Sequence, residues 1–199
     1  GKLKIDHRRM QGEEMEADQV VDKVCCYPET RVVITGGEPM IAKGLDRIAA
    51  LLGERGRHIT IETAGTVRPS GITCDLASLS PKLSGSVPRP GEISGGWIEK
   101  HEQRRLRPDI IADWVRDYNY QLKFVVCGEG DVDEIADLLS RVRDEGVEVP
   151  PEKVLLMPEG TDVETLRSRD DLISAACERH GYGTSRRLHI ELFGNTRGT

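Results

Sequence analysis

The run Arg31-Val32-Val33-Ile34, followed at once by Thr35-Gly36-Gly37-Glu38-Pro39, decides how this chain folds. Three consecutive β-branched apolar residues are typical of a buried strand, and the Gly-Gly and Pro that follow predict a turn. Isoleucine and leucine then recur at helical spacing over residues 41–52, and a glycine-bounded stop follows at 53–56. The unit is therefore a strand, a turn and a helix that returns the chain to the other end of the sheet.

The same unit recurs along the chain. Apolar runs alternate with helical periodicity, which indicates a parallel sheet with helical crossovers, either an open doubly wound sheet or a full or partial barrel. The segment Thr161-Asp162-Val163-Glu164 has the form of a capping box that opens a helix. We expect strands at residues 31–34, 58–63, 71–76, 121–126, 154–157 and 188–192, and helices at 14–26, 41–52, 108–118, 131–142 and 161–180.

Composition indicates one ordinary domain over residues 1–199. The chain carries 28 Lys and Arg against 34 Asp and Glu, a formal net charge of −6. This length can bury one core without disulfides, and the sequence shows neither a membrane span nor a signal pattern, so we expect a cytoplasmic protein. The acidic balance argues against nucleic-acid binding and is compatible with a small-molecule pocket.

Polar residues gather at the predicted carboxyl ends of the strands, where α/β proteins bind ligands. Gly36-Gly37 is either a plain tight turn or a place where the backbone approaches a ligand, with Glu38 ready to accept from an ammonium or hydroxyl group. Glu62 ends an apolar strand, where a carboxylate needs a partner, so a site role is favoured over a surface one. Lys82 is compatible with a solvated position, and Lys123 is equally compatible with solvent and with an inward position.

The cysteines form no recognisable cluster. There are five, an odd number without a C-x-x-C pair, so neither a disulfide framework nor a structural zinc site is indicated. Apolar surroundings predict that four of them are small buried hydrophobes, namely Cys25, Cys74, Cys127 and Cys177. Residues 84–96 lack periodicity and predict a loop.

Taken together, the motifs resemble the 7-carboxy-7-deazaguanine synthase family of radical S-adenosylmethionine (SAM) enzymes. A Gly-Gly-Glu-Pro string alone would indicate only the radical superfamily, whereas Ser-Pro-Lys, Leu-Met-Pro-Glu-Gly and the Gly-Asn-x-Arg-Gly tail are specific to this branch. The resemblance runs in order from about residue 15 to the last residue and is carried by residues 33–39, 61–65, 80–82, 121–126, 156–160, 187–190 and 194–199.

The resemblance implies a fold and a set of roles. The fold is a partial parallel (β/α)6 barrel of the TIM type, without its N-terminal strand and cluster loop. Thr35 and the terminal carboxylate of Thr199 are implied to contact the substrate. The residues implied to bind SAM are Gly36, Gly37, Glu38, Glu62, Thr63, Ser80, Pro81, Lys82, Gln121, Leu122, Lys123 and Phe124.

The resemblance also implies a reaction, the lyase-type conversion of 6-carboxy-5,6,7,8-tetrahydropterin to 7-carboxy-7-deazaguanine with loss of ammonia, in queuosine biosynthesis. The implied cofactors are SAM, a [4Fe-4S] cluster and Mg²⁺, and the cofactors supply the difficult chemistry while the protein positions them. The implied partners are the pterin substrate, an electron donor such as flavodoxin or ferredoxin, and a second copy of the chain in a homodimer.

One departure from the family is plain. The family ligates its cluster through three cysteines near the N-terminus, followed by an acidic and hydroxyl pair for Mg²⁺, and this sequence has neither. We interpret residues 1–14 as the remnant of the region after the cluster loop, and residues 193–199 as a tail that reaches the substrate. Two alternatives stay open: a catalytically silent SAM-binding or interaction protein derived from the family, and an unrelated α/β small-molecule enzyme.

Overall fold

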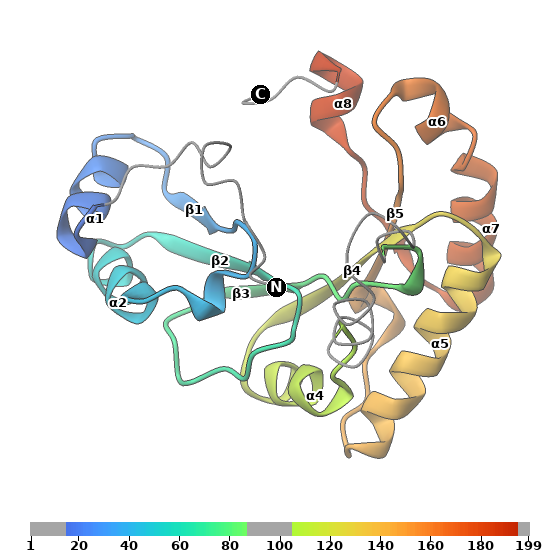
Figure 1. The fold of residues 1–199 in the computed structure, drawn as a ribbon, viewed down its shortest axis with the longest axis horizontal. Coiled ribbons are helices and arrows are strands. Elements are labelled where there is room, and N and C mark those ends of the chain that lie inside the picture. The colour runs from blue at the N-terminus through green and yellow to red at the C-terminus, as the bar shows by residue number, and fades with distance from the viewer. Residues whose placement is uncertain (1–14, 87–104, 195–199) are drawn as a thin grey trace, which may run out of the picture.

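The computed structural model describes residues 15–86 and 105–194, which build a six-stranded, all-parallel sheet with helices along it (Figure 1). The strands are β1 (Arg31–Ile34), β2 (His58–Thr63), β3 (Leu76–Leu79), β4 (Tyr120–Val126), β5 (Val154–Pro158) and β6 (Gly183–Thr184). The helices are α1 (Ala17–Cys25), α2 (Leu45–Glu54), α4 (Pro108–Asp117), α5 (Glu129–Asp144), α6 (Val163–Arg167), α7 (Asp170–His180) and α8 (Leu188–Phe193). The short 3-10 turns are η2 (Pro39–Ile41), η3 (Ser84–Ser86) and η4 (Pro151–Lys153).

The strands lie side by side in their order along the chain, from β1 to β6. A doubly wound sheet changes direction at a switch point, so this order excludes that alternative and agrees with the predicted partial barrel. Right-handed crossovers between neighbouring parallel strands place successive helices on the same face, and Figure 1 shows the helices around the outside of the curved sheet. Within the described residues β1 and β6 do not pair, so the barrel is open.

The two faces of the sheet differ in polarity, as β4 shows. Leu122 and Phe124 are fully buried, whereas Gln121, Lys123 and Val125 alternate with them and are only half-buried. Successive side chains of a strand point to opposite faces, so the polar ones share the face away from the helices. The core therefore lies between sheet and helices, and the inner face of the curve carries the polar groups.

The core is mainly aliphatic and contains three aromatic side chains, those of Trp114, Tyr120 and Phe124. Trp114 on α4 is fully buried and donates its indole N–H to the Val67 carbonyl at 3.0 Å, which satisfies the polar end of the ring. The largest fully buried side chains of the core are Trp114, Phe124, Leu52, Ile59, Ile61, Leu79, Ile111, Leu122, Ile135, Leu138, Leu156 and Ile190. None of the described helices has the length and apolar character needed to cross a bilayer.

The third strand lies later than predicted. Residues 71–75 are not a strand, and β3 covers Leu76–Leu79. The physical reason is the Asp75 carboxylate, which accepts the N–H of Ile59 at 2.7 Å and so occupies the donor that a backbone carbonyl would use. Pairing with β2 begins only at Leu76, opposite Thr60.

The predicted helix over residues 161–180 is two helices, α6 and α7. The cap is Asp162 and not Thr161, because the Asp162 carboxylate accepts the N–H of Thr165 at 2.8 Å. The helix breaks where the Ser168 hydroxyl donates back to the Thr165 carbonyl at 2.7 Å. Such local side-chain bonds compete with helix continuation.

The prediction of a sixth strand at residues 188–192 is wrong, since this segment is helix α8. The sixth strand is the two-residue β6, which apolar patterning could not reveal. A Cβ on Gly183 would lie 2.8 Å from Cδ2 of Leu155 on β5, so the glycine gives the end of that leucine side chain room beside β6. Of the predicted loop 84–96, residues 84–86 form η3, and the rest lies outside the described residues.

Three helix boundaries also differ from prediction. The helix expected from residue 41 begins at Leu45, because the preceding segment is η2, and the first helix begins at Ala17 instead of residue 14. Helix α5 extends the prediction in both directions, to Glu129–Asp144. The prediction of four buried cysteines is also wrong. Cys127 is exposed, because it lies in the loop after β4 and not in the strand. Cys25, Cys74 and Cys177 are only half-buried.

Candidate functional site

Three of the predicted site residues meet on the inner face of the sheet. The Lys123 ammonium on β4 lies 2.7 Å from Glu62 Oε1 at the end of β2. The Thr35 hydroxyl, just after β1, donates to Glu62 Oε2 at 3.2 Å. The structure thus resolves the orientation of Lys123 as inward and supplies the partner that the Glu62 carboxylate required.

The electrostatics of Glu62 follow from these contacts. Partial burial raises its pKa, but the hydrogen bond and the charge of Lys123, helped by Thr35 and Lys82, outweigh burial and hold the pKa below its ordinary value. Glu62 is therefore ionised at neutral pH, and with Lys123 it forms an ion pair without net charge on the inner face.

Replacing Lys123 with methionine should raise the pKa of Glu62, because burial then acts without its main compensating charge. In the parent chain the folded-state pKa is depressed, so the stability that Glu62 contributes is present above its unfolded-state pKa and is lost as pH falls through the folded-state value. Carbon-detected NMR titration of the Glu62 carboxyl measures the shift. Lys153→Met, at the amino end of β5, is the control and should leave Glu62 unchanged; an unchanged Glu62 pKa in Lys123→Met would contradict the pairing.

Glu38 connects the turn after β1 to the end of β2. Its carboxylate accepts the Thr63 hydroxyl at 2.8 and 2.9 Å, the Ala64 N–H at 3.0 Å and the Met40 N–H at 3.2 Å. Among the described residues no cation forms an ion pair with Glu38 within 4 Å. Its negative charge is thus held in place but not neutralised, which suits a site for a ligand ammonium group.

The Gly36-Gly37 pair leaves open space beside the Glu38 turn. Gly36 has φ of 144°, a conformation that favours glycine, and no atom lies within 4 Å of a Cβ built on either residue. The backbone of the turn is therefore uncovered. This geometry leaves room for close approach of a ligand and is equally compatible with a plain tight turn.

Gln121 forms a contact that the sequence did not reveal. Its side-chain amide donates to the hydroxyl of Ser78 on β3 at 3.0 Å, across two neighbouring strands. By contrast, Leu122 and Phe124 direct their side chains into the core, so only their backbone is left to serve a ligand. Ser78 is 43 residues away from Gln121, and only its place on the sheet links the two.

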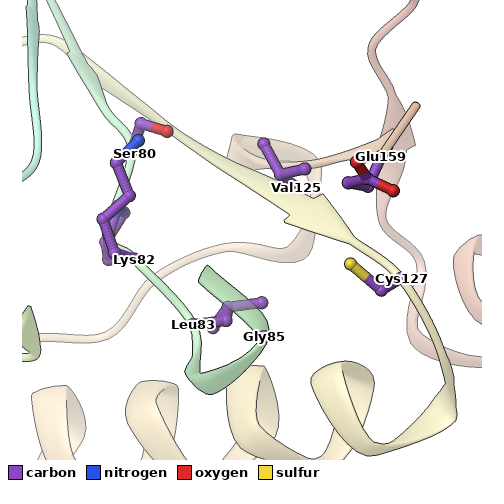
Figure 2. A pocket seen from close by; sticks show the side chains of 8 residues that line it. Ser80, Lys82, Leu83, Gly85, Val125, Cys127 and Glu159 are labelled. Carbon is purple, nitrogen blue, oxygen red and sulfur yellow. The ribbon is translucent and has the colours of Figure 1, made fainter. Parts of the chain in front are cut away.

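A cavity of about 330 Å³, within the size range of small-molecule sites, lies at the carboxyl ends of β3, β4 and β5. Of the predicted site residues, Ser80, Pro81 and Lys82 line it, whereas Glu38, Glu62 and Lys123 do not. Figure 2 shows Ser80 and Lys82 on one side of the cavity and Val125, Cys127 and Glu159 on the other. Pro81, Leu83 and Gly85 complete its lining. The predicted Ser80-Pro81-Lys82 segment is thus a cavity wall.

The ammonium group of Lys82 is influenced by the charges around it. Desolvation and then the charge of Lys123 lower the pKa of Lys82, while Glu62 and Glu38 oppose this shift.

The segment after Lys82 is held by Glu134. The Glu134 carboxylate on α5 accepts the N–H and the hydroxyl of Ser84 at 2.9 and 2.8 Å and pairs with Arg105. Arg105 in turn donates to the Lys82 carbonyl at 3.2 Å. Glu134 is 50 residues from Ser84, and no local pattern marks it.

The described residues do not fit an iron–sulfur cluster or a Mg²⁺ site. No three His, Cys, Asp or Glu side chains among them converge on a metal. Metal-binding cysteines are thiolates, and partial desolvation raises the pKa of the Cys74, Cys127 and Cys177 thiols. The predicted substrate contact Thr199 lies outside the described residues.

These features define an α/β protein of the partial-barrel class, with a charged small-molecule site at the carboxyl ends of its strands. No protein-family model matches the sequence. The 7-carboxy-7-deazaguanine synthase of Halobacterium salinarum is 37% identical over 188 residues, which cover 90% of this chain and 71% of that protein. The enzyme of the same name from Rhodopirellula baltica is 38% identical over 169 residues, 84% of this chain and 63% of that protein.

The chain belongs to the 7-carboxy-7-deazaguanine synthase family, an enzyme family of the radical SAM type. The crystal structure of QueE from Escherichia coli has a similar fold, with a TM-score of 0.57 at 21% identity over 87% of this chain and 64% of that one. This chain therefore spans about two thirds of the length of these relatives. The predicted family and the predicted fold are both confirmed.

Proposed function

We propose that this chain acts in the conversion of 6-carboxy-5,6,7,8-tetrahydropterin to 7-carboxy-7-deazaguanine, with SAM as cofactor. The observation that carries the proposal is its identity of 37–38% to two relatives of that name over 84–90% of the chain. The proposal includes the lyase class of the reaction, a role in queuosine biosynthesis, and the contacts of Thr35 and Thr199 with substrate. It also includes an electron donor such as flavodoxin or ferredoxin, a homodimer and a cytoplasmic location.

The charges around the site suit the amino-acid part of SAM. Glu38 offers an unneutralised negative charge beside the open Gly36-Gly37 backbone, and Lys82 offers a positive charge at the cavity wall. A group that carries both an ammonium and a carboxylate would complement these two ends. The Glu62–Lys123 pair, which links β2 to β4 across the intervening β3, would hold the floor of the site rigid and give Thr35 a fixed orientation.

The part of the reaction that depends on the iron–sulfur cluster is not assigned to the described residues. Bound SAM supplies radical chemistry when a reduced cluster is present, but the described residues do not fit that cluster. The proposed work of this chain is therefore limited to binding and orienting SAM and the pterin and to excluding water from the cavity. A SAM-binding protein without catalysis is the alternative that the test below distinguishes.

The test uses the protein as its organism encodes it, purified without oxygen and incubated with iron, sulfide, a chemical reductant, Mg²⁺, SAM and the pterin. Visible absorbance follows cluster formation, calorimetry follows SAM binding, and mass spectrometry follows 7-carboxy-7-deazaguanine. We expect all three signals. SAM binding without absorbance or product would support the silent protein instead, and the absence of SAM binding would overturn both.

A further inference from the structure

Arg187 is unusual among the charged side chains at this end of the sheet. It lies between β6 and α8, and its Nη1 donates to the Gly160 carbonyl at 3.2 Å. Its Nε is buried and has no hydrogen-bond partner in residues 15–86 and 105–194. Native proteins rarely leave a buried donor unpaired without a water, an ion or a ligand to satisfy it, so this atom calls for a partner.

The preceding residue provides a direct comparison. Arg186 is largely exposed and pairs with Glu191 one turn further on, with Nε donating to Oε1 at 3.0 Å. Arg187 is more buried, yet no carboxylate of the described residues lies within 4 Å of it. The described residues thus supply a counter-ion to the exposed arginine and not to the half-buried one.

The carboxylates near Arg187 are already engaged. Glu159, which lines the cavity and precedes Gly160, pairs with Arg169 at 2.6 Å. Glu62 pairs with Lys123 at 2.7 Å. Arg187 is close enough to Lys82 for its charge to disfavour the protonated form of that lysine, after the larger effects of desolvation and Lys123. Apart from Glu38, whose charge also acts on Lys82, the positive charges of Lys82 and Arg187 have no carboxylate partner within 4 Å among the described residues, and this excess attracts an anion.

We propose that Arg187 binds a carboxylate group of a ligand, with its unpaired Nε–H as one of the donors. A guanidinium is planar, always charged and able to bind a carboxylate through two parallel hydrogen bonds, which a lysine cannot do. The inference rests on the proposed function, under which two carboxylates enter the site. One is the methionyl carboxylate of SAM, and the other is the carboxylate of the pterin.

The experiment compares each ligand with a matched analogue that lacks the carboxylate. Calorimetry measures the binding of SAM, decarboxylated SAM, 6-carboxytetrahydropterin and tetrahydropterin to the parent chain and to Arg187→Gln, Arg187→Lys and Arg186→Gln. Arg187→Gln should weaken the binding of one carboxylated ligand by about tenfold or more, because a charged hydrogen bond is lost. Binding of its decarboxylated analogue should not change. Arg187→Lys keeps the charge and should lose less affinity for that ligand. Arg186→Gln should bind all four ligands as the parent chain does.

The ligand that is weakened identifies the source of the carboxylate. Equal weakening of a ligand and its decarboxylated analogue would show a merely structural role and overturn the proposal, as would unchanged binding of all four. If the parent chain binds none of them, the proposed function fails as well, whereas binding by the parent with no effect of Arg187→Gln overturns only the arginine assignment. If a thermal melt shows that Arg187→Gln does not fold, Arg187→Lys decides by the same criterion.

Discussion

Glu38→Ala is expected to lower both the stability of the protein and its affinity for SAM. The carboxylate is the acceptor for the Thr63 hydroxyl and the Ala64 N–H, and its removal leaves these partly or fully buried donors without that partner. Loss of such an acceptor costs about 1–3 kcal/mol. The charge that would face the ligand ammonium also disappears, so SAM binding should weaken by about tenfold or more, because a charged hydrogen bond contributes about 1.5–3 kcal/mol.

Urea denaturation measures the first effect and calorimetry with SAM the second. Glu148→Ala provides the control, since Glu148 is exposed and far along the chain from the site, and it should change neither quantity appreciably. A Glu38→Ala protein that keeps the parent affinity for SAM would contradict the assignment of Glu38 to the ligand site. An unchanged free energy of unfolding in Glu38→Ala would contradict the conclusion that its hydrogen bonds to Thr63 and Ala64 stabilise the fold.

Phe124→Ala is expected to destabilise the fold more strongly than Glu38→Ala does. The ring is fully buried on the helix-facing side of β4 and belongs to the main core. Truncation of a buried phenylalanine leaves a cavity and typically costs about 3–5 kcal/mol, a large fraction of the stability of an ordinary domain.

The chain has a second phenylalanine that serves as a matched control. Phe193, at the end of α8, is 59% exposed. Its replacement by alanine should change the free energy of unfolding by only about 0.5 kcal/mol. The urea midpoints of the two variants and the parent are the measurement. Comparable losses for the two variants would mean that β4 does not have the packing described.

Local order explains which site residues could be predicted. Glu38 and Glu62 each follow or end an apolar strand, and parallel strands bring their carboxyl ends to one edge, so the sequence was enough to place them near each other. Alternation within β4 also put Lys123 on the face of Gln121. Alternation could not predict which face of the sheet is the inner one, because this depends on the side on which the helices pack.

Tertiary contacts explain what was missed. Ser78 and Glu134 act through partners 43 and 50 residues away, and neither lies in a motif. Asp75 interrupts the third strand by bonding to the neighbouring strand, and the two-residue β6 depends on a close approach to Leu155. Such features are invisible to periodicity, because they depend on what another segment presents at that point.

The sequence by itself determined the family and the parallel α/β class, because motifs and apolar periodicity are properties of neighbouring residues. The tertiary structure alone decided that the sheet is singly wound and open and that Lys123 neutralises Glu62. It also decided that, among the described residues, Glu38 and Arg187 have no charged partner within 4 Å. Charge neutralisation depends on distances of a few ångströms between side chains far apart in sequence. Those distances exist only once the strands have been brought side by side.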